Sequence, residues 1–317
     1  MMMNSAPVPA QGEERKEKSS WWRILLSALL FYLLSLGALL LTHNPNLFPT
    51  VVMLGVFMVP AAYAAFFYDH RYLSQLTVGA AARSFLYGGL LGVIAASILE
   101  PIFIHNMSPA SMFVVGLIEE FAKILGVIII AWRLRHDSEI DGIILGVAAG
   151  MGFAALESMG YSFTGFLRSG GSLSLTLFVT MVRGIMSPLG HGTWTGILAS
   201  VLFREARNGR FQVNWKVIGA YLTVVVLHAL WDLLPLAMAF FLLPGLDIFI
   251  GQTIVGLVGL FILWRRWREG RRLQLAEIAA TTPIAPPNDG QADAAVPSDA
   301  AHLSAQPPVH VNNGFGG

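Results

Sequence analysis

Three ionisable side chains stand in the middle of an apolar run, in the order Glu119-Glu120-Phe121-Ala122-Lys123. The run extends from residue 110 to residue 132, about the length of a helix that crosses a membrane. A charge at the centre of such a helix raises the free energy of membrane insertion by at least about 2.5 kcal/mol, so charged residues there indicate a functional site. Lys123 lies one turn after Glu119 and can neutralise it, which leaves Glu120 to find a partner on another helix.

Four more polar residues interrupt later apolar runs: Glu157, His191, His228 and Asp232. His228 and Asp232 are four residues apart and share a helix face. We therefore expect the carboxylate to accept a hydrogen bond from one ring nitrogen, with the other facing the interior of the bundle. With a helical rise of about 1.5 Å per residue, all these side chains reach a similar depth, toward the outer half of the bilayer.

This combination of groups suits hydrolysis of an amide, which needs an activated water, a stabilised oxyanion and a proton for the leaving nitrogen. Glu119 or Glu120 is the predicted base. His228, oriented by Asp232, is predicted to donate to the oxyanion, and Glu157 or His191 to position the water.

A catalytic zinc is the alternative mechanism, with His191, His228 and a carboxylate such as Glu157 as its three ligands. Glu120 and Asp232 are the other carboxylates that suit this role. The chain has no HExxH motif and no cysteine, so the usual helical pair of imidazoles and any thiolate ligand are missing. A glutamate-activated water without metal is the favoured interpretation.

Hydrophobic residues make up 55% of the chain and charged residues 12%, which indicates a polytopic membrane protein of all-α class. Hydropathy predicts about eight transmembrane helices, and the sixth and seventh are long enough to kink or turn near Pro188 and Pro235. The predicted spans are residues 22–42, 49–68, 85–104, 110–132, 141–163, 173–203, 216–243 and 246–264.

The basic residues test this count independently, because short cytoplasmic loops hold most Lys and Arg. With a cytoplasmic N-terminus, seventeen of the twenty lie in cytoplasmic segments and only Arg168 lies outside. Lys123 and Arg183 are inside spans. We therefore expect a multi-pass protein of the plasma membrane with both termini in the cytoplasm.

The two ends are predicted to be disordered cytoplasmic tails, residues 1–20 and 276–317, because they are polar and lack apolar periodicity. Residues 21–268 form the predicted transmembrane domain, with the motifs between about 85 and 264. The first apolar run is too long for a cleaved signal peptide and is interpreted as a retained span.

Four motifs in order, EExxK at 119–123, FxxxE at 153–157, HxxxT at 191–195 and HxxxD at 228–232, resemble those of the PrsW family of intramembrane proteases. This resemblance implies cleavage of a single-span membrane protein in the lipid bilayer, typically an anti-sigma factor, near the outer face (site-1 type cleavage). It carries the catalytic role to Glu119, Glu120, Glu157, His191, His228 and Asp232, with Lys123 in support. The related CAAX-processing proteases have His in place of Glu157, and usually Arg, one residue further on, in place of Lys123.

Other interpretations remain open from the residues alone. The charged residues could form a purely structural ion-pair network, and the chain could be a proton-coupled transporter or a non-catalytic scaffold that binds partner helices. Arg183 either reaches the interface or pairs with a carboxylate, and Glu100 is interpreted as interfacial. No nucleic-acid partner is expected. Five glycines are predicted to permit close helix approach: Gly88, Gly92, Gly142, Gly146 and Gly150.

Overall fold

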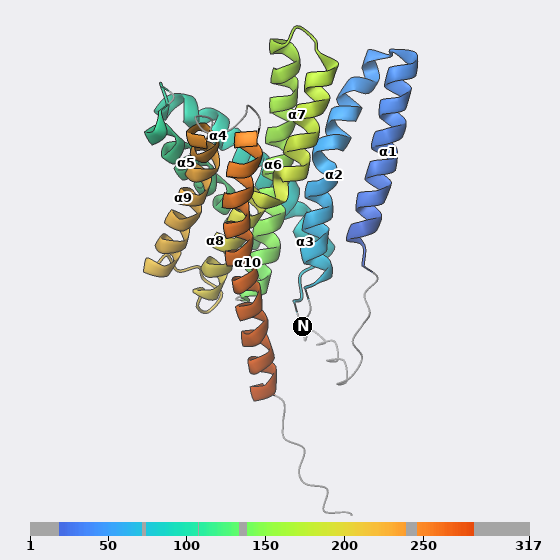
Figure 1. Cartoon of the computed structure of the whole chain (residues 1–317). Helices are drawn as coiled ribbons and strands as arrows, with labels where there is room; N and C mark the ends of the chain where they lie inside the picture. Colours follow the sequence, from blue (N-terminus) through green and yellow to red (C-terminus); the bar gives the residue numbers. More distant parts are fainter. Residues whose placement is uncertain (1–18, 72–73, 107, 133–137, 239–245, 282–317) are drawn as a thin grey trace, which may run out of the picture. The chain divides into compact units, whose positions relative to one another are not determined.

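A computed structural model describes residues 19–71, 74–106, 108–132, 138–238 and 246–281 (Figure 1). Every regular element in these ranges is helical, and the one β-bridge joins Arg207 to Arg210, so the predicted all-α class is confirmed. The main helices are α1 (Trp21–Thr42), α2 (Phe48–Asp69), α3 (Val78–Arg83), α4 (Gly89–Phe103), α5 (Pro109–Ala131), α6 (Glu139–Arg168), α7 (Leu173–Met186), α8 (His191–Arg204), α9 (Trp215–Met238) and α10 (Leu246–Thr281).

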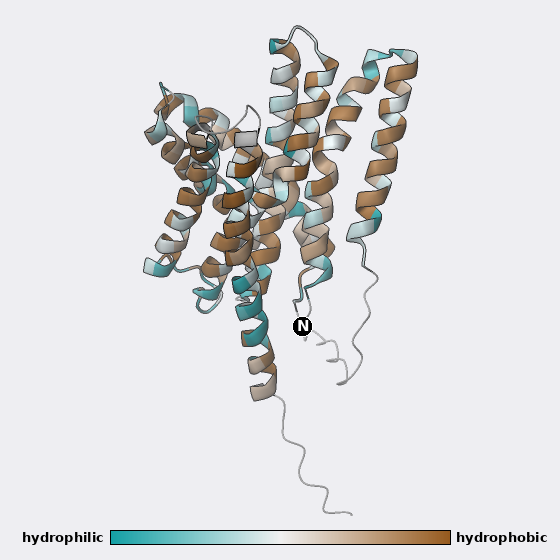
Figure 2. Cartoon of the chain, viewed as in Figure 1, coloured by the Kyte–Doolittle hydropathy of each residue, from teal (hydrophilic) through white to brown (hydrophobic). Residues whose placement is uncertain are grey.

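Seven helical segments of the described chain are long and apolar enough to cross a membrane. Figure 2 shows their hydrophobic character, with hydrophilic residues mostly gathered at helix ends. The one predicted span missing from these seven is the fourth, residues 110–132, which corresponds to α5; this helix is 23 residues long and carries the three ionisable residues of the EExxK motif. Each predicted span therefore has a helix, and α5 differs from the others by its internal charge.

The sixth predicted span is interrupted at the proline, as expected. Helix α7 ends at Met186, a 3₁₀ turn η3 covers Ser187–Leu189, and α8 begins at His191. Proline cannot donate a backbone hydrogen bond, which favours the break. The seventh behaves differently, because α9 continues through Pro235 to Met238. The predicted remainder of that span, residues 239–243, lies outside the described residues.

Helix α6 is the centre of the bundle and packs against α2, α4, α7 and α8. Its apolar window is 83% buried, against at most 39% for any other candidate span. Helix α8 is enclosed by protein as well, because every residue from Gly192 to Phe203 is buried. Among its neighbours, α8 makes the most extensive contact with α6. This central position brings any polar side chain of α6 within reach of several neighbouring helices.

The contact between α6 and α8 depends on glycine, as the four-residue repeat predicts. A Cβ atom placed on Gly142 or Gly146 would lie 2.5 Å from the carbonyl oxygen of Ala199 or Thr195, too close for any side chain. Gly88 and Gly92 likewise face α6, where a Cβ would meet Ala149 or Phe153 at 2.7 Å. The glycines thus let the backbones approach closely, and the first residue of α8, His191, is fixed against α6.

Helix α5 has a well-defined beginning. Ser108 accepts a hydrogen bond from the Ser111 backbone N–H at 3.2 Å, and the Ser111 hydroxyl oxygen accepts from the Ser108 N–H at 2.7 Å, which forms a capping box. Pro109 occupies the first helical turn, where its missing N–H costs nothing. These local signals set where α5 starts and hence which way its polar residues face.

The described residues up to Ala276 form one compact unit. Of the predicted tails, residues 1–18 and 282–317 lie outside the described residues. Helix α10 continues to Thr281, past residue 276 where the C-terminal tail was predicted to begin.

Candidate active site

The centre of the site is the side chain of Lys123, which is fully buried on α5. Its Nζ lies 2.9 Å from Glu119 Oε2 and 2.9 Å from Glu120 Oε1, so one ammonium group donates to both carboxylates. The expectation that Glu120 has no partner within α5 was therefore wrong, since Lys123 three residues on reaches it. Thr195 of α8 adds a long contact of 3.4 Å to the other oxygen of Glu120.

His228 of α9 is oriented by α5 and not by its own helix. Its Nδ1 lies 3.0 Å from Glu120 Oε1, and because a carboxylate only accepts, Nδ1 carries the proton. Its Nε2 lies 3.8 Å from Asp232 Oδ2, which is too long for a hydrogen bond. The predicted pairing of His228 with Asp232 is thus replaced by a bond to Glu120, and Nε2 faces Glu119 at 3.7 Å.

His191, the first residue of α8, has a partner on each ring nitrogen. Lys123 Nζ donates to Nδ1 at 2.7 Å, and Nε2 donates to Glu157 Oε2 on α6 at 3.2 Å. An ammonium group has no lone pair, so these two bonds assign a neutral ring with its proton on Nε2. His191 therefore links the α5 cluster to Glu157.

Arg183 of α7 is the second permanent cation of the site. Its Nη2 lies 2.6 Å from Glu157 Oε2, and its Nε donates to the Ser158 hydroxyl at 3.1 Å. The guanidinium carbon also lies 4.0 Å from the ring centroid of Tyr161. Of the two interpretations that the sequence left open, the structure supports pairing with a carboxylate.

Aromatic rings hold the imidazoles in place. Trp194 is fully buried, and its ring centroid lies 4.9 Å from that of His228 and 5.3 Å from that of His191. Phe153 is the first residue of the FxxxE motif, and its ring centroid lies 4.0 Å from Lys123 Nζ and 5.1 Å from the ring centroid of His191. Both aromatic residues lie within the sequence motifs, FxxxE for Phe153 and HxxxT for Trp194. Their contacts with the imidazoles, however, depend on how the helices pack.

A further carboxyl group lies beside the site. Glu100 of α4, interpreted from the sequence as interfacial, interacts electrostatically with Glu119. The only sequence signal was a carboxylate inside an apolar run, next to Pro101 at the end of a span.

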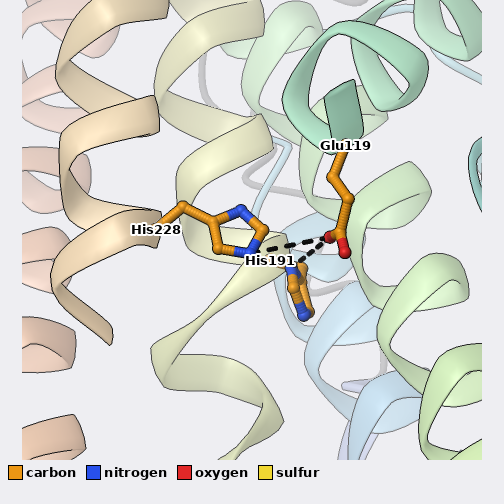
Figure 3. A group of neighbouring side chains, drawn as sticks. All are labelled: Glu119, His191 and His228. Atoms are coloured by element: carbon orange, nitrogen blue, oxygen red, sulfur yellow. Dashed lines mark ion pairs between the residues drawn. The ribbon is translucent and has the colours of Figure 1, made fainter. Parts of the chain in front are cut away.

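Three of these residues point ligand atoms at a common centre. Figure 3 shows Glu119, His191 and His228 converging from α5, α8 and α9, and one ligand atom from each lies within 4.8 Å of the others. Glu119 supplies the carboxylate of this group, where Glu157 was the predicted ligand. Glu157 and Glu120 instead bind the outer nitrogens of His191 and His228, the arrangement in which carboxylates orient metal-binding imidazoles.

The charges of this group do not balance. The part of the chain that the structure describes places five carboxyl groups here, and only two permanent cations: Glu100, Glu119, Glu120, Glu157 and Asp232 against Lys123 and Arg183. An excess of buried negative charge must be compensated by bound protons or by a further cation. A divalent metal ion would satisfy both this excess and the ligand geometry.

The site is closed on one side and open on the other. Glu119, Glu120, Lys123 and His228 are buried, whereas the side chains of Glu157, Arg183 and Asp232 are 18%, 30% and 31% exposed. A cavity of about 260 Å³ borders His191 and Arg183 on this open side. A reacting group would therefore reach the buried carboxylates past His191.

The sequence that forms this site is similar to known proteins. The family described as PrsW family intramembrane metalloprotease matches residues 77–264, which include every residue of the site. The protein named Protease PrsW from Halalkalibacterium halodurans is 27% identical over 176 residues, which cover 54% of this chain and 77% of that protein. No solved structure gave a significant match.

Proposed function

This chain belongs to the PrsW family of intramembrane metalloproteases. We propose that the ionisable group around Glu119 hydrolyses a peptide bond of a single-span membrane protein. This group, called the Glu119 cluster, consists of Glu119, Glu120, Lys123, Glu157, Arg183, His191 and His228. The observation that carries this proposal is the convergence of Glu119, His191 and His228 in a buried group with one open side. Such convergence suits an activated water, because a carboxylate and two oriented imidazoles surround the same point. The substrate class proposed is an anti-sigma factor.

In the proposed reaction, a water molecule enters beside Glu119, whose carboxylate takes one of its protons as the oxygen attacks the carbonyl carbon. Glu119 then returns this proton to the leaving nitrogen as the C–N bond breaks. His228 faces the same point through Nε2 while Glu120 holds Nδ1. A proton on Nε2 would stabilise the oxyanion.

The donor set also fits a divalent metal ion. Glu119, His191 and His228 would hold it, and the ion would polarise the carbonyl and lower the pKa of a bound water. Glu120 and Glu157 would keep both imidazoles in the correct orientation. For His191 to use its Nδ1 as a ligand, Lys123 must withdraw from its 2.7 Å contact with that atom.

The test compares cells that produce the wild-type protein with cells that produce Glu119→Gln. Membrane proteomics should find a small set of single-span proteins, an anti-sigma factor among them, that accumulate uncleaved in the variant. A structural network or a scaffold predicts no such accumulation. Equal processing in the two strains, with equal amounts of folded protein in the membrane, would eliminate the protease assignment of this site.

A further inference from the structure

The cavity beside the site contains a polar group that the reaction above does not use. Its walls come from α6, α7, α9, α10 and the turn between α7 and α8, and they include Arg183, His191, Trp231 and Gln252. Gln252 belongs to α10, the only helix of the described bundle that borders this cavity without contributing to the Glu119 cluster. It lies inside a candidate membrane span, Phe249–Ala280.

The side-chain amide of Gln252 has no hydrogen-bond partner among the residues that the structure describes. Apart from the Trp231 indole, for which the described residues offer no hydrogen-bond partner, the other polar side chains of the cavity wall are already bonded. Arg183 binds Glu157 and Ser158, and the Ser187 hydroxyl donates to the Gly184 carbonyl at 2.7 Å. The Gln252 side chain is only partly buried, and an amide without a partner inside a membrane span is available to bind a ligand at the cavity.

The chemistry of the substrate identifies such a ligand. A helix bonds its own backbone groups, so a peptide bond becomes open to attack only where the helix unwinds, and each freed N–H and C=O then needs a partner in the apolar region. A glutamine amide supplies both a donor and an acceptor, which matches one peptide group. We propose that the cavity receives the unwound backbone of the substrate beside the scissile bond, and that Gln252 hydrogen-bonds one of its peptide groups.

This inference rests on the proposed function and adds a substrate-positioning residue to it. The first test replaces Gln252 by leucine, which has similar size and no hydrogen-bonding groups. With the purified full-length single-span protein found in the cell comparison as the probe, Gln252→Leu should lower kcat/KM about tenfold, mostly through a higher KM. Gln252→Asn, which keeps a donor and an acceptor, should retain more activity than Gln252→Leu.

Gln274→Leu is the matched control, because it removes another glutamine of α10 whose amide donates to Ser138 at 2.7 Å, away from the cavity. It should change KM less than twofold. Thermal melting of all three variants separates weaker substrate binding from loss of folding.

The second test uses the absence of cysteine from the chain, so that Gln252→Cys introduces the only thiol. In the Glu119→Gln background, oxidation should cross-link this thiol to single cysteines placed near the cleavage site of the probe, and not to those elsewhere in its span. An unchanged KM in Gln252→Leu together with no cross-link overturns the inference. The proposed function would then still stand if wild type cleaves the probe and Glu119→Gln does not.

Discussion

His228 donates its Nδ1–H to Glu120, a residue 108 positions earlier on another helix, at 3.0 Å. Asp232, one turn further along its own helix, stays 3.8 Å from the opposite ring nitrogen. This pairing decides the orientation of the imidazole. It leaves Nε2 facing Glu119, which is the geometry on which the proposed reaction depends.

A pair of variants tests this orientation. Glu120→Gln removes the charge that holds His228 Nδ1 and one partner of Lys123, so we expect the cleavage rate to fall by about 10² or more. Asp232→Asn should cost less than about tenfold, since no hydrogen bond to His228 is lost. Rates of purified protein under single-turnover conditions provide the measurement, and the reverse order of effects would contradict the assigned orientation.

Glu119→Gln should abolish cleavage while the protein remains folded in the membrane. The carboxylate is the predicted proton acceptor, and the amide that replaces it keeps the size and can still accept from Lys123. Glu269→Gln serves as the control, because Glu269 is a half-exposed carboxylate that pairs with Arg204 outside the site. Near-normal activity of Glu119→Gln, measured with the same amount of folded protein, would refute the acid–base assignment.

Metal content separates the two mechanisms. If a divalent ion is bound, the purified wild-type protein should contain about one equivalent, and His191→Ala or His228→Ala should lose it. Glu157→Gln should weaken metal binding by about 10- to 100-fold, since Glu157 holds the outer nitrogen of His191. Elemental analysis and titration with a chelator measure these effects. Fully active wild-type protein that contains no metal would eliminate the metal mechanism.

Gly146→Val should destabilise the bundle. Even a Cβ at this position meets the Thr195 carbonyl at 2.5 Å, so α8 must move away from α6. Overpacking of this kind typically costs about 1–3 kcal/mol, and the movement should also disturb His191 at the start of α8. Gly219→Val, where no atom lies within 4 Å of the added Cβ, is the matched control for thermal melting in detergent. Equal melting temperatures for the two variants would contradict the close packing of α6 and α8.

The predicted topology rests on the distribution of basic residues. Reporter fusions after Leu47, Ser169 and Gly245 should report the outside of the membrane. Fusions after Arg71, Arg135, Asn208 and Arg272 should report the cytoplasm. A cytoplasmic signal after Ser169 would invalidate the predicted orientation, because this loop holds the one basic residue assigned to the outer side.

The sequence alone determined the helices, the motifs and one ion pair within a helix. Helical spacing places residues four apart on one face, so the bond of Lys123 to Glu119 follows from the geometry of α5. The glycine repeat likewise indicated close packing, and Pro188 indicated the break before His191. These features depend on local geometry, which one stretch of sequence contains in full.

The tertiary structure decided which ring nitrogen meets which carboxylate. The pairs His228–Glu120 and Arg183–Glu157 lie 108 and 26 residues apart, and their formation depends on the rotation and spacing of packed helices. Spacing along α9 predicted Asp232 as the partner of His228, but the approach of α5 placed Glu120 closer. Gln252 and Glu100 became part of the site for the same reason: only the packing of α10 and α4 brings their side chains to the cavity and to Glu119.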